Sequence, residues 1–351
     1  MRNLATRLER FALRRLLELP ASWQTKISGQ PALEIDGLTL HPEIQLLLAA
    51  WKWRGNARLR AETPLAARAC FRAETLRYPI ECEVESVSDF TIPAGTGALR
   101  VRHYTCADPG APLLVYFHGG GFVLGDLDTH DAPCRLLCRH AALHILAIDY
   151  RLAPEHPFPA AADDASAAFG WAARHAAELG ADPSRLCVGG DSAGGNLATV
   201  VAQHAARMGA PTPAAQLLIY PCVDLVDEAR SLQLFGSGLV LDREDRAWFM
   251  GHYLSAGADR NDLRLSPLRV EDASGLCPAY IVTAGFDPLR DEGEAYARKL
   301  AQAGVRTVLR RYDGFVHGFL NLVGSSPASR GIVIEIARAL GAFVREVHAQ
   351  R

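Results

Sequence analysis

The sequence predicts an α/β fold with a mostly parallel central sheet, helices on both of its faces and a helical cap. From about residue 84 onward, short apolar runs alternate with longer segments of helical character, which is the pattern of parallel strands joined by crossover helices. Several of these runs end in glycine-rich loops, where sharp turns are permitted. We therefore expect an N-terminal helical cap segment at 1–84 and a main domain at 85–351, with a second cap insertion at about 222–265.

The individual elements follow from runs of apolar residues and from the glycine and proline breaks between them. The expected strands cover residues 84–92, 99–104, 112–118, 143–150, 186–189, 214–220, 279–285 and 305–312. Helices are expected at 4–19, 42–52, 63–76, 130–140, 160–179, 194–207, 292–303 and 329–347, with an aromatic helix around 248–253. Gly95-Thr96-Gly97 is a hairpin signal between the first two strands.

Composition narrows the classes of function. The chain has 351 residues, of which 49% are hydrophobic and 22% are charged, as in an ordinary globular protein. A net charge of −2 gives no reason to expect a nucleic-acid partner. The twelve histidines show no metal-ligand spacing, and the eight cysteines form no C-x-x-C pair. We expect reduced thiols in a cytoplasmic protein, with no metal and no cofactor.

Gly190-Asp191-Ser192-Ala193-Gly194 stands between an apolar strand and a helix and matches the pattern of a nucleophile elbow. In such a turn the serine backbone is held in a strained conformation, which exposes the hydroxyl above the sheet. The helix that follows directs its free N–H groups to the same point. The same five-residue pattern also occurs in ordinary loops, but the strand-then-helix context favours the elbow. Ser192 is therefore the candidate nucleophile.

A serine nucleophile needs a base to accept its proton and an acid to orient that base. In this fold class both are expected on loops after strands, in the chain order serine, acid, histidine. His317 follows the last expected strand between aromatic and glycine neighbours, and is the candidate base. Asp287 follows the penultimate strand and is the candidate acid. Asp224, after the preceding strand, is kept as the rival acid.

His118-Gly119-Gly120-Gly121 follows another apolar run and is the candidate oxyanion hole. Three successive glycines allow the backbone to approach a substrate and present N–H groups that no side chain obstructs. We expect the N–H groups of Gly119, Gly120 and Ala193 to surround the developing negative charge. A phosphate-binding loop is the competing interpretation, but no Gly-Lys-Ser/Thr sequence follows.

The first 23 residues alternate arginines with leucines and contain no continuous apolar stretch, so a signal peptide is not expected. No other stretch approaches the apolar length of a membrane span. An amphipathic, arginine-rich helix can lie on a membrane surface. The alternative, which we favour, is a helix packed over the protein's own active site.

Six motifs in the expected order resemble the bacterial hormone-sensitive lipase-like esterases (family IV carboxylesterases) of the α/β-hydrolase fold. They are His118-Gly119-Gly120-Gly121, Asp149-Tyr150-Arg151-Leu152-Ala153-Pro154-Glu155, Gly190-Asp191-Ser192-Ala193-Gly194-Gly195-Asn196, Tyr220-Pro221, Asp287-Pro288-Leu289-Arg290-Asp291-Glu292-Gly293 and His317-Gly318-Phe319. The resemblance runs from about residue 82 to the C-terminus. It implies that Ser192 is the nucleophile, His317 the general base and Asp287 its orienting acid. It also implies structural roles for Arg151 and Glu155 around Pro154.

The resemblance further implies a serine carboxylesterase that acts on short- to medium-chain esters, and a homodimer. Amide, lactone or carbamate cleavage by the same triad is the first alternative. The second is a non-enzymatic ligand receptor, but receptors of this lineage typically lack the triad histidine, which is present here as His317. Apolar residues near these motifs and in the insertion are expected to wall the substrate pocket, or else to pack the cap on the core. They are Phe122, Val123, Leu124, Trp248, Phe315 and Phe319.

Overall fold

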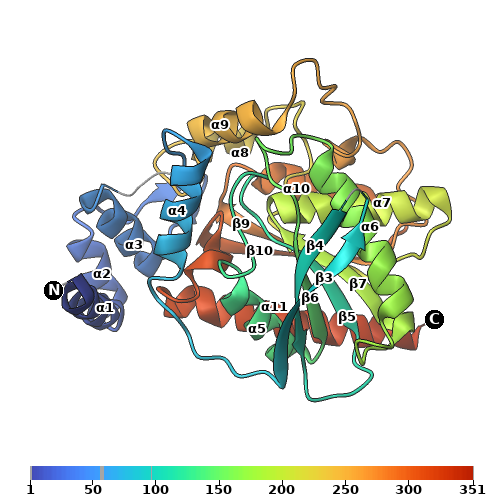
Figure 1. Ribbon diagram of the computed structural model, residues 1–351. Helices are drawn as coiled ribbons and strands as arrows, with labels where there is room; N and C mark the ends of the chain where they lie inside the picture. The colour runs from blue at the N-terminus through green and yellow to red at the C-terminus, as the bar shows by residue number, and fades with distance from the viewer. Residues whose placement is uncertain (1, 56–58, 96, 351) are drawn as a thin grey trace.

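The computed structural model describes residues 2–55, 59–95 and 97–350, and it has an eight-stranded sheet at its centre (Figure 1). The strand order is β10-β9-β8-β7-β5-β6-β4-β3. The six strands from β10 to β6 pair in parallel, while β4 and β3 are antiparallel. The predicted fold class, a mostly parallel sheet, is confirmed.

The strands occupy the apolar runs expected from the sequence. Their bounds are β3 Ser86–Ala94, β4 Gly97–Thr105, β5 Leu113–Phe117, β6 His144–Asp149, β7 Leu186–Asp191, β8 Gln216–Ile219, β9 Ala279–Phe286 and β10 Thr307–Val316. Every residue of β5, β7, β8 and β9 is buried, because helices cover both faces of these central strands. In the β3–β4 hairpin, Ala94 pairs with Gly97, and Thr96 lies outside the described residues.

Two layers of helices enclose the sheet (Figure 1). On one face α5 (Asp131–Ala141) packs against α11 (Pro327–Ala349). On the other face lie α6 (Ala160–His175), α7 (Ala193–Met208) and α10 (Arg290–Gln302), whose apolar residues share one core. The alanine-rich sequence of α6 lets it pack closely on α7. Two hydrophobic cores, one on each face, therefore hold the sheet in place.

The cap consists of two segments far apart in the chain. The N-terminal segment contains α1 (Arg2–Leu17), α2 (Ala21–Ile27), β1 (Glu34–Ile35), β2 (Leu38–Thr39), α3 (Pro42–Trp53) and α4 (Pro64–Thr75). The insertion after β8 contains α8 (Arg230–Phe235) and α9 (Arg243–Tyr253). Three short 3₁₀ helices, η1 (Pro183–Arg185), η2 (Pro267–Arg269) and η3 (Phe319–Leu322), complete the described elements. In Figure 1 the N-terminal helices lie at the left of the sheet, and α8 and α9 lie above it.

Local sequence explains where the cap helices begin. Proline stands at the first turn of α3 and α4, where the missing N–H costs nothing. The His41 side chain accepts a hydrogen bond from the backbone of α3, and Thr63 does the same for α4. Asp242 and Asp245 form a capping box at the start of α9. The sequence did not predict α2, α8, β1 or β2, because elements of two to seven residues are too short for a periodic pattern.

Contacts with the main domain hold the N-terminal segment in place. The backbone N–H of His41 donates to the carbonyl of Gly314 at 2.8 Å. Glu43 on α3 accepts hydrogen bonds from the Ser326 hydroxyl and from the Ala328 backbone at the start of α11. No helix in the described ranges is long and apolar enough to cross a membrane.

Candidate active site

The turn from β7 into α7 has the geometry expected of a nucleophile elbow. Ser192 has φ 54° and ψ −117°, a conformation that L-residues rarely adopt. A Cβ atom at Gly194 would lie 1.9 Å from the Phe117 carbonyl oxygen, and one at Gly190 would lie 2.4 Å from the same atom. Only glycine can occupy these two positions, because the turn passes so close to the end of β5. The Ser192 side chain lines a cavity at the carboxyl end of the sheet.

The structure brings Ser192, His317 and Asp287 together. His317 Nε2 lies 2.9 Å from Ser192 Oγ, and His317 Nδ1 lies 2.8 Å from Asp287 Oδ2. Asp287 is fully buried, and its other carboxylate oxygen accepts the Leu289 backbone N–H at 2.7 Å. With a proton on Nδ1, the histidine donates to Asp287 and can accept the serine proton at Nε2. Three loops, each following a strand, thus form one continuous hydrogen-bonded relay.

The rival acid, Asp224, has other partners. Its carboxylate lies 3.3 and 3.4 Å from the Arg269 guanidinium, and its Oδ1 accepts the Val226 backbone N–H at 2.9 Å. Asp287, and not Asp224, makes the hydrogen bond to His317.

The glycine loop after β5 corrects one of the expected oxyanion donors. The Gly119 N–H donates to Asp191 Oδ1 at 2.9 Å, so it is not available to a substrate. Gly120 and Gly121 instead face the cavity, as does Ala193. Both glycines have positive φ, 118° and 61°. In the described part of the chain, the backbone N–H groups of Gly120, Gly121 and Ala193 have no hydrogen-bond acceptor. Gly121 is therefore a candidate donor in place of Gly119.

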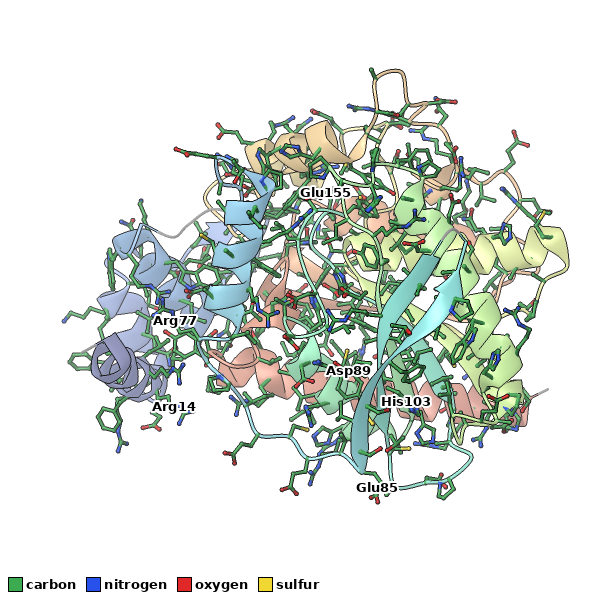
Figure 2. All side chains as sticks on the ribbon, viewed as in Figure 1. Arg14, Arg77, Glu85, Asp89, His103 and Glu155 are labelled. Atoms are coloured by element: carbon green, nitrogen blue, oxygen red, sulfur yellow. The ribbon has the colours of Figure 1, made fainter. Side chains whose placement is uncertain are left out.

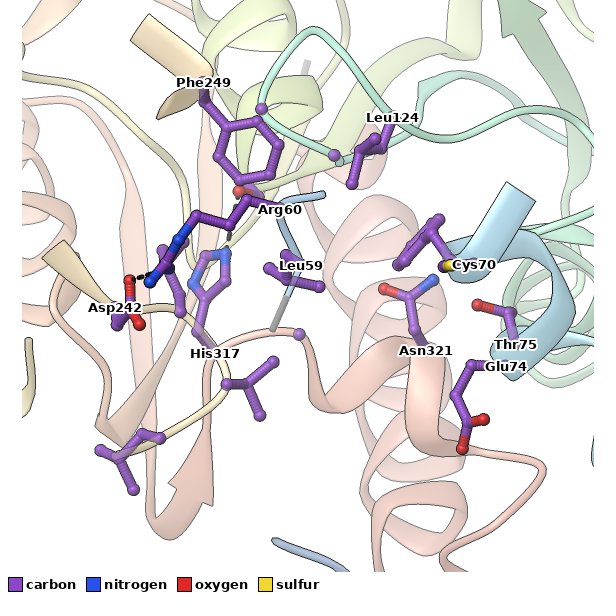
Figure 3. Close-up of a pocket in the computed structure, with 18 of the residues that line it drawn as sticks. Leu59, Arg60, Cys70, Glu74, Thr75, Leu124, Asp242, Phe249, His317 and Asn321 are labelled. Carbon is purple, nitrogen blue, oxygen red and sulfur yellow. Dashed lines mark hydrogen bonds and ion pairs between the residues drawn. The ribbon is translucent and has the colours of Figure 1, made fainter. Parts of the chain in front are cut away.

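The serine and histidine lie in the wall of a cavity of about 820 Å³ between the sheet edge and the cap. Figure 3 shows His317 beside the Arg60–Asp242 pair, with Glu74, Thr75 and Asn321 across the cavity. The cap contributes apolar lining residues from both of its segments. They include Leu48, Trp51, Leu59, Phe71, Leu239, Leu241, Phe249 and Met250. This volume suits a small organic molecule with an apolar portion.

Comparison with known proteins agrees with this geometry. Residues 114–321 match a family model described as "alpha/beta hydrolase fold". The chain belongs to the α/β-hydrolase family. It is 48% identical over 337 residues to "Carboxylic ester hydrolase LipN" of Mycobacterium tuberculosis, covering 94% of this chain and 90% of that protein. It is 43% identical over 263 residues to "Ethyl acetate hydrolase" of Pseudomonas putida, covering 72% and 82% of the two chains.

Among solved structures, an α/β-hydrolase enzyme from the metagenome of Lake Arreo, Spain, is similar to this chain with a TM-score of 0.83 and 40% identity. The match covers 87% of this chain and 98% of that one. The resemblance to hormone-sensitive lipase-like esterases, which rested on six motifs, is confirmed.

The expected pocket walls of this α/β hydrolase are only partly correct. Phe122 and Leu124 line the cavity. Val123, Trp248, Phe315 and Phe319 lie outside its lining. Val123 is fully buried in the core around α6 and α7. Trp248 packs edge-on against its neighbour Phe249, and it is Phe249 that reaches the cavity. Phe315 and Phe319 pack against each other in the core on the α11 side.

The first helix, α1, does not pack over the active site as expected. Leu17, at its C-terminal end, is buried in the core that also contains apolar residues of α3. The described α1 side chains, residues 10–17, contribute nothing to the cavity lining. Figure 2 shows Arg14 at the left of the molecule, away from the sheet, and the Phe11 side chain is 58% exposed. The helices that cover the site are α3, α4 and α9.

Arg68 on α4 joins the cap to the loop around Pro154. Its guanidinium binds the Glu155 carboxylate at 2.6 and 2.8 Å and the Ala153 carbonyl at 2.8 Å, and its Nε donates to the Val123 carbonyl. Glu155 lies beside the cap in Figure 2. The Arg151 guanidinium donates several hydrogen bonds to the carboxylate of Asp164 on α6. Both residues named by the family resemblance therefore make structural contacts around this loop.

Asp191 supports the glycine loop from beneath. Besides Gly119, its carboxylate accepts the Tyr116 hydroxyl at 2.7 Å and lies 3.5 Å from His130 Nε2. Burial acts to raise the pKa of Asp191, but the charge and hydrogen bond of His130 and the bond from Tyr116 hold that pKa below its ordinary value. The carboxylate is therefore ionised, and its Oδ1 fixes Gly119, the first glycine of the loop.

Replacing Asp191 by alanine is expected to lower the free energy of unfolding by about 1–3 kcal/mol, because it leaves the buried Gly119 N–H without an acceptor. It should also lower kcat, since the loop that carries Gly120 loses its support. Urea unfolding and steady-state kinetics measure the two effects. The control is Asp89→Ala, which removes a carboxylate bound to Arg102 on the β3–β4 hairpin. A variant with unchanged kcat would contradict the supporting role.

Glu292 is a buried carboxyl group near the site. Its Oε1 accepts the Val223 backbone N–H at 2.8 Å, and burial raises its pKa to about 7. As the pH rises from 4.5 to 7, the unfolded chain releases this proton while the folded protein keeps it, so stability falls over that interval. The shift corresponds to roughly 3 kcal/mol at one pKa unit per 1.36 kcal/mol.

Replacing Glu292 by glutamine should remove this pH-dependent loss. We expect the variant to gain stability relative to the wild type between pH 4.5 and 7.5, by up to roughly 3 kcal/mol. Urea unfolding of both proteins at several pH values measures the difference. A difference that stays constant across this range would show that Glu292 ionises as freely in the folded protein as in the unfolded chain.

Proposed function

We propose that this protein is a serine carboxylesterase that hydrolyses small carboxylic esters through an acyl-serine intermediate. The observation that carries the proposal is the relay from Asp287 through His317 to Ser192, which ends in the wall of a largely apolar cavity. The relatives named carboxylic ester hydrolase and ethyl acetate hydrolase support the choice of esters as the substrate class. No cofactor enters the reaction.

In the first half of the reaction, Ser192 Oγ attacks the ester carbonyl while His317 Nε2 accepts the serine proton. The buried Asp287 stabilises the imidazolium that forms and keeps the ring correctly oriented. The N–H groups of Gly120, Gly121 and Ala193 are the proposed donors to the oxyanion. The imidazolium then protonates the leaving alcohol, which separates from the acyl-serine.

In the second half, a water molecule takes the place of the alcohol. His317 accepts a proton from this water as it attacks the acyl-serine carbonyl, and the same donors bind the second oxyanion. Collapse of the intermediate returns the proton to Ser192 Oγ and releases the carboxylic acid. Every proton transfer uses the same Nε2 atom, which lies 2.9 Å from the serine oxygen.

Short- to medium-chain esters are the proposed substrates, because the cavity of about 820 Å³ has apolar walls of limited extent. Hydrolysis of p-nitrophenyl esters from acetate to palmitate tests this proposal. We expect kcat/KM to be highest between the butyrate and octanoate and to fall sharply for the palmitate. Absence of hydrolysis across the series would overturn the esterase function, while a maximum at palmitate would overturn only the chain-length preference.

A homodimer and a cytoplasmic location remain predictions from the sequence and its family resemblance. Size-exclusion chromatography with light scattering tests the first. Contact of α1 with a membrane surface, the alternative that we did not favour, is tested by flotation with anionic vesicles.

A further inference from the structure

A guanidinium group in the cavity wall has no role in the proposed reaction. Arg246, on α9, lines the same cavity as Ser192 and His317, and its side chain is only 18% exposed. The nearest carboxylate oxygen, on Glu292, is 3.8 Å away, beyond normal hydrogen-bond distance. Among the residues that the structure describes, no hydrogen bond is made by the Arg246 guanidinium. Five N–H donors in a half-enclosed site require acceptors, from water or from a ligand.

The other carboxylates near α9 are bound to a different arginine. Arg60 lies 2.8 Å from Asp242 and 2.7 Å from Asp245, and it also binds Glu244 (Figure 3 shows the Asp242 pair). Arg60 thus forms ion pairs with three acidic side chains at the start of α9, and none of these three pairs with Arg246. The positive charge of Arg246 is left facing the cavity.

Among the described residues, Glu292 has the carboxyl group that pairs with Arg246, and it balances the arginine's positive charge only in part. Glu292 is buried, and its Oε1 accepts the backbone N–H groups of Val223 and Asp224, while its Oε2 is the oxygen that lies 3.8 Å from Arg246. Because burial raises its pKa to about 7, Glu292 is only partly ionised at neutral pH. The Glu292 carboxyl group also lies close to the catalytic elbow. It binds the backbone of Val223, and the preceding residue, Cys222, donates its backbone N–H to the Ser192 carbonyl at 3.1 Å.

We propose that Arg246 binds a carboxylate group of the substrate, so that the preferred esters carry a second, free carboxylate on their acyl or alcohol portion. Half-esters of dicarboxylic acids are the simplest members of this class. The inference rests on the proposed esterase function and specifies its substrate. A planar guanidinium binds a carboxylate through two parallel hydrogen bonds. Apolar residues in the same cavity lining, among them Leu225, Leu241 and Leu289, reduce the competition from water for this contact.

The test compares charged and uncharged esters of matched size. On the acyl side, p-nitrophenyl hydrogen adipate is compared with p-nitrophenyl hexanoate. On the alcohol side, 4-butyryloxybenzoate is compared with phenyl butyrate. In the wild type, we expect one charged ester to be hydrolysed at least as efficiently as its uncharged partner, and the pair that shows this identifies where the carboxylate lies.

Arg246→Gln should reduce kcat/KM for that charged ester by about 10- to 100-fold, mainly through KM, while the uncharged partner changes less than about twofold. Arg246→Lys should restore part of the loss. The matched control is Arg243→Gln on the same helix, because Arg243 pairs with Glu228 and does not line the cavity. The ratio of the two esters is independent of how much of each variant is folded.

Binding of adipate, followed by its effect on Tm, provides a readout that needs no turnover. Adipate should raise the Tm of the wild type and of Arg243→Gln, but not that of Arg246→Gln. Equal losses on charged and uncharged esters, or an adipate effect that survives in Arg246→Gln, would overturn the carboxylate site. If wild-type protein hydrolyses no ester but shows the Arg246-dependent adipate effect, the esterase function fails and the carboxylate site stands.

Discussion

Ser192→Ala should lower kcat for p-nitrophenyl butyrate by roughly 10⁴- to 10⁶-fold, because the relay then ends without a nucleophile. The protein should remain folded, since alanine fits the elbow and the serine hydroxyl bonds only His317 in the described contacts. The measurement is the steady-state rate, with circular dichroism as the check on folding.

The matched control for this variant is Ser325→Ala. Ser325 lines the same cavity, but its hydroxyl donates to the Leu322 carbonyl and not to a histidine. We expect this control to retain wild-type kcat within a few-fold. Undiminished hydrolysis by Ser192→Ala would show that another group forms the acyl intermediate.

Asp287→Asn should lower kcat by about 10⁴-fold, because an asparagine amide cannot stabilise the imidazolium and can favour the wrong histidine tautomer. The loss should appear in kcat and in kcat/KM alike, since the carboxylate lies on the far side of His317 from the serine. Steady-state kinetics on p-nitrophenyl butyrate measures it.

Asp224→Asn provides the comparison, because Asp224 is also buried and also follows a strand of the sheet. Its partners are Arg269 and the backbone of Val226, so we expect a loss of less than tenfold. If Asp224→Asn costs far more turnover than Asp287→Asn, the assignment of the acid is wrong.

The main features of the site could be predicted because they depend on local chain geometry. Gly190 and Gly194 mark the elbow because only residues without a side chain fit beside the end of β5. The positions of Asp287 and His317 follow from the rule that parallel strands bring their carboxyl ends to one edge. Such constraints act over a few residues or through a regular topology, and so they can be recognised in the sequence.

The errors concern contacts between distant segments. Gly119 was expected to bind the oxyanion, but its N–H pairs with Asp191, 72 residues further along the chain. Trp248 was expected in the pocket. Consecutive side chains on an α-helix point about 100° apart, so Phe249, the next residue on α9, lines the cavity instead. The position of α1 depends on contacts between the cap and the main domain, and no local sequence pattern specifies these contacts.

The fold class, the elbow and the order of the three relay residues could be inferred before folding was considered, because each depends on backbone space or on strand topology. The N–H groups that remain for the oxyanion and the side chains that form the cavity could be identified only in the folded protein. The same is true of Arg246, whose charge is left facing the cavity because Arg60, far away in the chain, takes the neighbouring carboxylates. Each donor or charged group pairs with whichever partner the fold brings close to it. The hydrogen bonds and ion pairs therefore cannot be assigned until the folded structure is known.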